Sequence, residues 1–173
     1  MIFKIDTCPP GGDYGHELMN GSSSWDGSVF RYVRSGPYVP PLSLVIGTAI
    51  GTREFVSAYD RMEGWTLFAY AVTPGKVYRA NWREWGDRWR YPSDLQPDLE
   101  EPEDYHELPE DAETRAACPE LFVLDFKLSE SPPKYGGFFR RFPMGRIFCT
   151  QKEKDWFENE FNSDGLYHFV EVE

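Results

Sequence analysis

One order of elements is predicted twice in this chain, at residues 42–72 and again at residues 146–172. It consists of a strand, a helix with a threonine N-cap, a glycine that ends the helix, and a second strand. Thr52 precedes the first helix and Gly64 ends it, whereas Thr150 and Glu153 form a capping box before the second helix and Gly165 follows it. Side chains at helical spacing follow each threonine: Phe55, Val56, Tyr59 and Met62 in the first copy, and Trp156, Phe157, Glu160 and Phe161 in the second. The copies share little residue identity, and the second helix is expected to be the longer one.

Further strands are predicted at residues 1–6, 29–33 and 120–128, where Phe122, Leu124, Phe126 and Leu128 would share one face. Residues 73–76 fit a type II turn, which would return residues 77–82 as the antiparallel partner of the strand at 65–73. Two main helices and about seven strands indicate an α+β fold with a mixed or antiparallel sheet. At this length we expect a single domain over residues 1–173. A doubly wound α/β fold is not expected, because there are too few helices to cover both faces of its sheet.

Composition excludes several classes of function. The formal net charge of −11 and the pI near 4.7 argue against a protein that binds nucleic acid or an anionic membrane surface. No apolar run approaches the roughly twenty residues that span a bilayer, and the N-terminus lacks the pattern of a signal peptide. Cys8, Cys118 and Cys149 are odd in number and far apart, which does not suggest a disulfide framework. A cytoplasmic location is the expectation.

Nearly all of the net charge lies in residues 94–113, which hold ten carboxylates and no Lys or Arg. The spacing fits no calcium loop and His106 is a lone imidazole, so no metal site is expected. Two interpretations stay open for this run, within a Pro-rich acidic insertion at residues 92–118. It is a solvated loop between two halves of the sheet, or it is a surface that attracts a basic partner.

The stretch at residues 82–91 alternates Trp and Arg, residue types that either cover a core or dominate protein interfaces. It leads directly into the acidic run, so one continuous partner-binding surface is a hypothesis. Its apolar anchors would be Trp85, Trp89 and Tyr105. The carboxylates that would steer a partner are Asp98, Glu100, Glu101, Glu103, Asp104 and Glu107.

Catalytic constellations are sparse. Cys149 stands near a helix N-terminus with His168 nearby in sequence, but a cysteine at a strand end is expected to be simply buried. Residues 47–52 lack the lysine and spacing of a phosphate-binding loop, and no G-x-S-x-G or H-E-x-x-H motif occurs.

Residues 29–37 and 45–72 resemble the arginine-bearing strand and the following hydroxyl strand, helix and strand of toxin-type ADP-ribosyltransferases. The resemblance implies an NAD-binding Arg31 or Arg34, an ordering hydroxyl at Thr48 and a Glu113 that stabilises an oxocarbenium ion. Gly47-Thr48-Ala49 replaces the family's Ser-Thr-Ser signature, and no Gln/Glu-x-Glu motif precedes a strand.

A second resemblance covers about half of the chain. Residues 40–62 and 122–173 are similar to bacterial immunity proteins encoded beside polymorphic toxins, a class once catalogued only as a domain of unknown function. The shared features are the N-terminal strand, the Pro-Pro-Leu segment before a strand and helix, and the closing strand, capped helix and Gly-Leu-x-x-Phe strand. This resemblance implies tight stoichiometric binding of a cognate toxin without catalysis.

The sequence therefore favours a non-catalytic cytoplasmic protein, without cofactor or metal, whose partner is a cognate protein toxin of basic charge. The alternative is an ADP-ribosyltransferase-like enzyme that uses NAD. A structural or regulatory module with no toxin partner is a third possibility.

Overall fold

A computed structural model describes residues 1–7, 24–25, 30–31, 33–34, 40–45, 48–71, 76–77, 111–141, 146–162 and 165–172. The chain divides into two compact units, each described by itself below. Unit 1 comprises Met1–Cys8, Pro41–Tyr70 and Phe122–Glu173, and unit 2 comprises Pro9–Pro40 and Ala71–Leu121. Unit 1 contains both copies of the repeated pattern. The expectation of a single domain stays a prediction.

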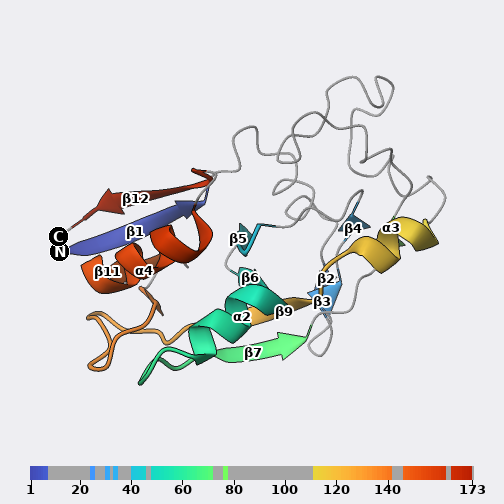
Figure 1. Cartoon of the computed structure of the whole chain (residues 1–173). Helices are drawn as coiled ribbons and strands as arrows, with labels where there is room; N and C mark the ends of the chain where they lie inside the picture. Colours follow the sequence, from blue (N-terminus) through green and yellow to red (C-terminus); the bar gives the residue numbers. More distant parts are fainter. Residues whose placement is uncertain are drawn as a thin grey trace. The chain divides into compact units, whose positions relative to one another are not determined.

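The first sheet of unit 1 has the order β10 (Phe139–Arg140), β11 (Ile147–Thr150), β1 (Ile2–Thr7) and β12 (Tyr167–Glu171), and every neighbouring pair is antiparallel (Figure 1). Phe3 lies opposite Cys149 on one side and opposite Glu171 on the other. Phe3 and Ile5 are buried, as alternation along a half-buried strand requires. The strand predicted at residues 1–6 is confirmed.

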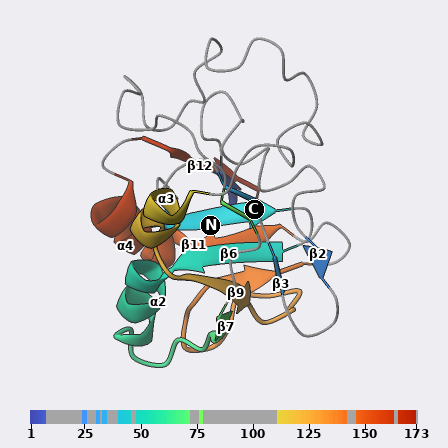
Figure 2. The ribbon, with the colours of Figure 1, turned by 90° about the vertical axis from the view of Figure 1, so that its right-hand side faces the viewer.

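The second sheet of unit 1 has the order β5 (Leu42–Val45), β6 (Thr48–Thr52), β9 (Leu121–Asp125) and β7 (Phe68–Ala71). β5 and β6 form an antiparallel pair with Leu42 opposite Gly51. Figure 2 shows β6 and β9 as adjacent arrows. Phe122, Leu124 and Phe126 are buried as predicted, but Leu128, three residues beyond the end of β9 at Asp125, is 64% exposed.

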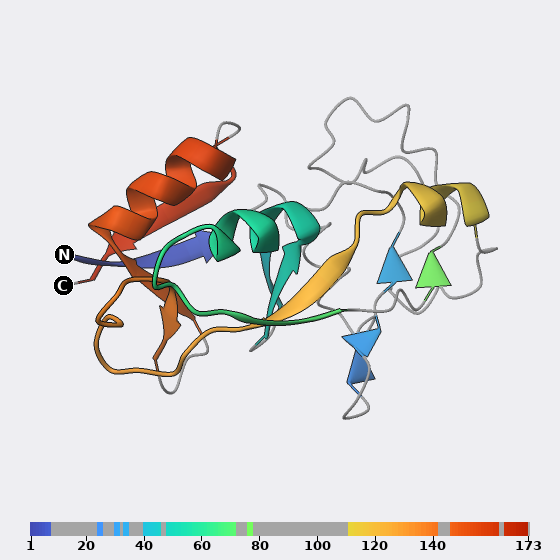
Figure 3. The same cartoon turned by 60° about the horizontal axis from the view of Figure 1, so that its bottom comes forward.

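The two helices of unit 1 are α2 (Arg53–Asp60) and α4 (Gln151–Phe161) (Figure 3). Each follows a strand without a loop, and the last residue of the strand, Thr52 or Thr150, is the N-cap of the helix. The Thr52 hydroxyl accepts a hydrogen bond from Phe55 N at 3.3 Å, and Thr150 belongs to a capping box with Glu153. Gly64 and Gly165 follow the helices with φ of 79° and 67°. The predicted repeat is therefore confirmed, with α4 the longer helix.

Aromatic rings from both helices meet in the core of unit 1. The Phe55 ring lies 5.6 Å from Phe161 and 6.0 Å from Phe157, and Tyr59 lies 6.0 Å from Trp156. Phe138 is 5.8 Å from Tyr59. Burying one such side chain is worth about 1.5–3 kcal/mol, so this cluster joins the two copies into one folded body. Glu160, predicted on the same side of the helix, is exposed.

Unit 2 contains the antiparallel pair β2 (Ser24–Trp25) and β3 (Phe30–Arg31), the parallel pair β4 (Val33–Arg34) and β8 (Lys76–Val77), and helix α3 (Ala112–Ala117). The α+β fold with two main helices is confirmed. The prediction that residues 77–82 pair with the strand at 65–73 is wrong for Val77, the one residue of 77–82 that the structure describes. Val77 lies on β8, which pairs with β4, whereas the neighbour of β7 is β9. The turn at residues 73–76 depends only on local sequence. Strand β9, about fifty residues later in the chain, pairs with β7 instead, and Phe122 and Leu124 of β9 are buried. Helix α3 lies inside the predicted loop, where the sequence indicates no helix.

Candidate functional site

The nine residues proposed to bind a partner lie outside the described residues: Trp85, Trp89, Asp98, Glu100, Glu101, Glu103, Asp104, Tyr105 and Glu107. What the structure does describe is the end of the acidic run. Asp111 Oδ1 accepts a hydrogen bond from Glu113 N at 3.3 Å, and Asp111 O accepts one from Arg115 N at 3.0 Å. Asp111 thus begins α3 as an N-cap, and α3 contacts β8 within unit 2. The acidic run therefore ends on an ordered element.

The residues of the alternative enzyme site fall on separate elements. Arg31 lies on β3, Arg34 on β4, Glu113 on α3, and Thr48 begins β6 opposite Val45. Arg31, Arg34 and Glu113 belong to unit 2 and Thr48 belongs to unit 1. The NAD site composed of these residues stays a prediction.

Cys149 and His168 cannot form a nucleophile and base. They lie on β11 and β12, which are separated by β1, and their partners on β1 are Phe3 and Asp6. Side chains three residues apart on a strand point to opposite faces, and two strand spacings span about 10 Å. Cys149 is fully buried and His168 is exposed. Burial is the main reason that the pKa of the Cys149 thiol lies far above its ordinary value. The expectation of a buried cysteine is confirmed.

Several hydrogen bonds surround Glu153, which is 1% exposed. Its Oε1 accepts a hydrogen bond from Gly137 N at 3.2 Å, and its Oε2 accepts one from Thr150 N at 2.8 Å and another from the Thr150 hydroxyl. A buried carboxylate is stable only when hydrogen bonds replace its hydration. Glu153 therefore ties the start of α4 to the segment before β10, beyond the capping box that the sequence predicts.

Two glycines make this arrangement possible. Gly136 and Gly137 have φ of 93° and 104°. A Cβ at Gly136 would lie 2.5 Å from Trp65 Nε1 and 2.8 Å from Glu153 Oε1, and a Cβ at Gly137 would lie 2.7 Å from the Tyr59 hydroxyl. The positive φ and these close approaches both require glycine. The sequence signal is the glycine pair at residues 136–137, which by itself indicates only a break between strands.

Two aromatic side chains complete the cluster formed by Tyr59, Trp65, Gly136, Gly137, Thr150 and Glu153, which we call the Glu153 cluster. The Tyr59 hydroxyl accepts a hydrogen bond from Phe138 N at 2.8 Å. Burial raises the pKa of Tyr59 well above its ordinary value, and the charge of Glu153 raises it further. Trp65 Nε1 is buried without a hydrogen-bond partner among the described residues. Tyr59, Trp65, Gly137 and Glu153 are buried while Gly136 and Thr150 are half-buried, and the hydrogen bonds of the Glu153 cluster join α2, α4 and the loop before β10.

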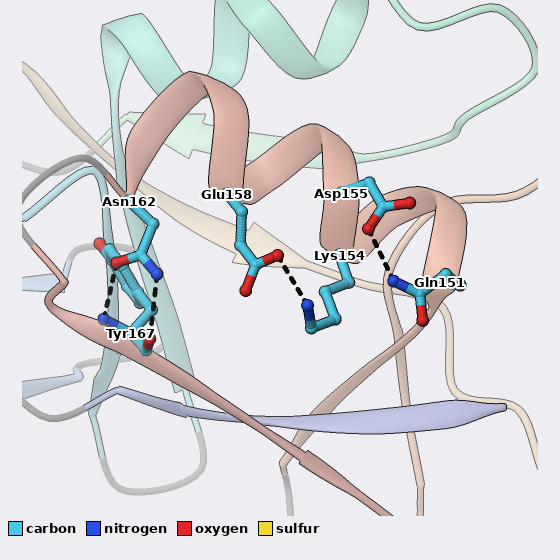
Figure 4. A network of polar contacts seen from close by, with 6 residues as sticks. All are labelled: Gln151, Lys154, Asp155, Glu158, Asn162 and Tyr167. Carbon is cyan, nitrogen blue, oxygen red and sulfur yellow. Dashed lines mark hydrogen bonds and ion pairs between the residues drawn. The ribbon is translucent and has the colours of Figure 1, made fainter.

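A second polar junction links β5 to β12. The Tyr167 hydroxyl donates to Leu42 O at 2.8 Å and accepts from Leu42 N at 2.9 Å. At the end of α4 the side-chain amide of Asn162 donates a hydrogen bond to Tyr167 O and accepts one from Tyr167 N, both at 3.0 Å (Figure 4). Lys154 and Glu158 form an ion pair on the same helix. These contacts fix Tyr167 and so fix the edge of β5.

Strand β7 displays exposed aromatic side chains. Phe68 is 61% exposed and Tyr70 is 56% exposed, on a strand that ends the order of its sheet. The sequence predicts an aromatic strand here but gives no sign of its exposure, since the pattern of aromatic residues alone does not distinguish a core strand from an edge strand.

No known protein family, curated protein or solved structure matches the chain. Among the described residues, no group of three or more His, Cys, Asp or Glu is placed to hold a metal ion. None of the helices in the described part of the chain is long and apolar enough to cross a membrane.

Proposed function

We propose that this protein neutralises a cognate toxin of basic charge by tight association in the cytoplasm, without catalysis. The observation that carries the proposal is the acidic run at residues 94–113, whose sequence holds ten carboxylates and no Lys or Arg. Such a concentration of one sign of charge attracts an oppositely charged partner over a long range and speeds its encounter. The resemblance of residues 40–62 and 122–173 to immunity proteins supports the same role.

The proposed interface combines steering and anchoring. Carboxylates from Asp98 to Glu107 would accelerate the encounter, and Trp85, Trp89 and Tyr105 would lose their hydration in the complex and slow dissociation.

The test is co-expression with the protein encoded by the neighbouring gene, scored by growth and by co-purification. We expect rescue of growth and a 1:1 complex. Measured with purified proteins, the variant Glu100→Gln, Glu101→Gln, Glu103→Gln, Asp104→Asn should lower the association rate by about tenfold or more at low salt.

A matched control removes the same charge elsewhere. Glu54, Asp60, Glu63 and Asp125 are exposed on α2, on the loop that follows it and on β9. Changing these four to Gln or Asn alters the net charge equally, and we expect less than about a threefold effect on the association rate. Equal effects of the two variants would show that net charge alone matters and would remove the assignment of the surface. Absence of any complex would reject the proposed function.

A calorimetric titration of the isolated chain with NAD separates this proposal from the ADP-ribosyltransferase alternative. The proposal expects no heat of binding. Saturable binding that is lost in Arg31→Ala, with the fold retained, would favour the enzyme.

A further inference from the structure

The two sheets of unit 1 have the same construction. In β5-β6-β9-β7 and in β10-β11-β1-β12, two antiparallel neighbours come first. The second strand of each order, β6 or β11, ends at the threonine that precedes the helix. The strand that follows the helix, β7 or β12, takes the fourth position of the same sheet. In each sheet the place between is filled by a strand from a distant part of the chain. The repeated pattern therefore extends to the topology of both sheets.

The intervening strand comes from the other half of the chain in both cases. The first half runs β1, β5, β6, α2, β7, and the second half runs β9, β10, β11, α4, β12. The first strand of the first half, β1, lies between β11 and β12, whereas the first strand of the second half, β9, lies between β6 and β7. Each half thus contributes its leading strand to the sheet of the other half.

The two leading strands agree in sequence. Residues 2–6 read Ile-Phe-Lys-Ile-Asp and residues 121–125 read Leu-Phe-Val-Leu-Asp. Phe3 and Phe122 are each 6% exposed, and the aliphatic residues two positions later, Ile5 and Leu124, are 0% and 1% exposed. The same positions of the two strands therefore fill the core.

Each helix places a cation over the phenylalanine of the incoming strand, at the first position after the threonine in α2 and at the fourth in α4. Arg53 of α2 lies with its guanidinium 4.4 Å from the ring centre of Phe122, and Lys154 of α4 lies with its ammonium 5.6 Å from the ring centre of Phe3. Seven residues after the capping threonine, each helix carries a fully buried ring, Tyr59 in α2 and Phe157 in α4. A cation over an aromatic face is attractive, so each helix contacts the phenylalanine of its incoming strand by the same interaction.

We propose that unit 1 is an internal duplication whose two halves have exchanged their leading strands, and that the two receiving positions are equivalent. Each position selects a strand with Phe at its second place and an aliphatic residue at its fourth. The occupant of each position is the leading strand of the opposite half of the same chain.

The test exchanges the two strand sequences within the full chain. Ile2→Leu, Lys4→Val and Ile5→Leu are combined with Leu121→Ile, Val123→Lys and Leu124→Ile, leaving both Phe and both Asp in place. The four Ile and Leu exchanges conserve volume, and the two exchanges of Lys and Val fall at half-buried positions, so we expect the ratio of folded to unfolded protein to change by less than about tenfold. A control with unchanged composition, Phe3→Lys with Lys4→Phe, reverses the pattern on one strand and should lower that ratio by at least about a hundredfold.

A disulfide in the full chain tests the pairing itself. Lys4 and Val170 are opposite each other on β1 and β12, at a spacing that suits a disulfide. We expect Lys4→Cys with Val170→Cys to oxidise to this link, detected by mass spectrometry of proteolytic peptides. The proposal is overturned if the link does not form, if the exchanged chain is as unstable as the reversed control, or if the reversed control is as stable as the parent protein.

Discussion

Gly137 offers the sharpest test of a single residue. Its φ is 104°, and a methyl carbon added there would approach the Tyr59 hydroxyl to 2.7 Å, so Gly137→Ala carries both backbone strain and a clash. We expect the free energy of unfolding to fall by about 2–4 kcal/mol, measured by urea denaturation.

Gly165→Ala is the matched control for this substitution. Gly165 also has a positive φ, of 67°, but a Cβ there would meet nothing within 4 Å. The left-handed conformation alone costs about 1–2 kcal/mol. Equal losses for the two variants would show that the Glu153 cluster relaxes around the added methyl group.

Tyr167 makes the stability depend on alkaline pH. Burial holds the pKa of its hydroxyl above the ordinary value of 10.0, and the hydrogen bond from Leu42 N opposes this only in part. Above pH 10 the unfolded chain releases the proton while the folded chain keeps it. The contribution is therefore complete below pH 10 and is lost as the pH rises, by about 1.4 kcal/mol for each pH unit.

Tyr167→Phe removes that dependence along with two hydrogen bonds. At pH 7 we expect a loss of about 1–3 kcal/mol in the free energy of unfolding, because Leu42 N and O lose their side-chain partner. Between pH 10 and pH 11 the variant should lose stability less steeply than the parent protein. Parallel curves of stability against pH would contradict a buried, protonated Tyr167.

At the scale of an element, the two threonine caps are not equivalent. Thr52 accepts one hydrogen bond from Phe55 N, whereas the Thr150 hydroxyl donates to the buried carboxylate of Glu153. We expect Thr52→Ala to cost about 1 kcal/mol and Thr150→Ala to cost about 2–3 kcal/mol, since the second leaves a buried acceptor with one donor fewer. Thermal unfolding of both variants measures the difference, and equal costs would mean that Thr150 acts only as a cap.

How well the sequence predicts these elements depends on how far apart in the sequence the interacting residues are. Both helices follow from local chemistry: a threonine cap, apolar spacing and a glycine stop such as Gly64. The pairing of β7 with β9 does not, because the local turn signal at residues 73–76 indicates a hairpin and no local signal reveals Phe122 as a competitor. Glu153 is recognisable as half of a capping box, but its contact with Gly137 joins residues sixteen apart and cannot be read from a motif.

At the scale of the whole molecule, we expect the carboxylates of the acidic run to contribute little to the free energy of unfolding. The acidic run is predicted to serve a partner, so neutralising Glu100, Glu101, Glu103 and Asp104 should leave the free energy of unfolding within about 0.5 kcal/mol of the parent protein. Urea denaturation of the same variant used for binding checks this. A loss of several kcal/mol would show that these carboxylates hold the fold together and would undermine their assignment to a partner.

The exchange of leading strands also determines when the protein can finish folding during its synthesis. Strand β1 is synthesised before the other strands of unit 1, but its neighbours β11 and β12 end at Thr150 and Glu171. The sheet of the first half likewise has to wait for β9, which ends at Asp125. Contacts so distant in sequence form slowly. Neither half can be completed in the order in which it is made, so β1 stays without its sheet neighbours until Glu171 has been translated.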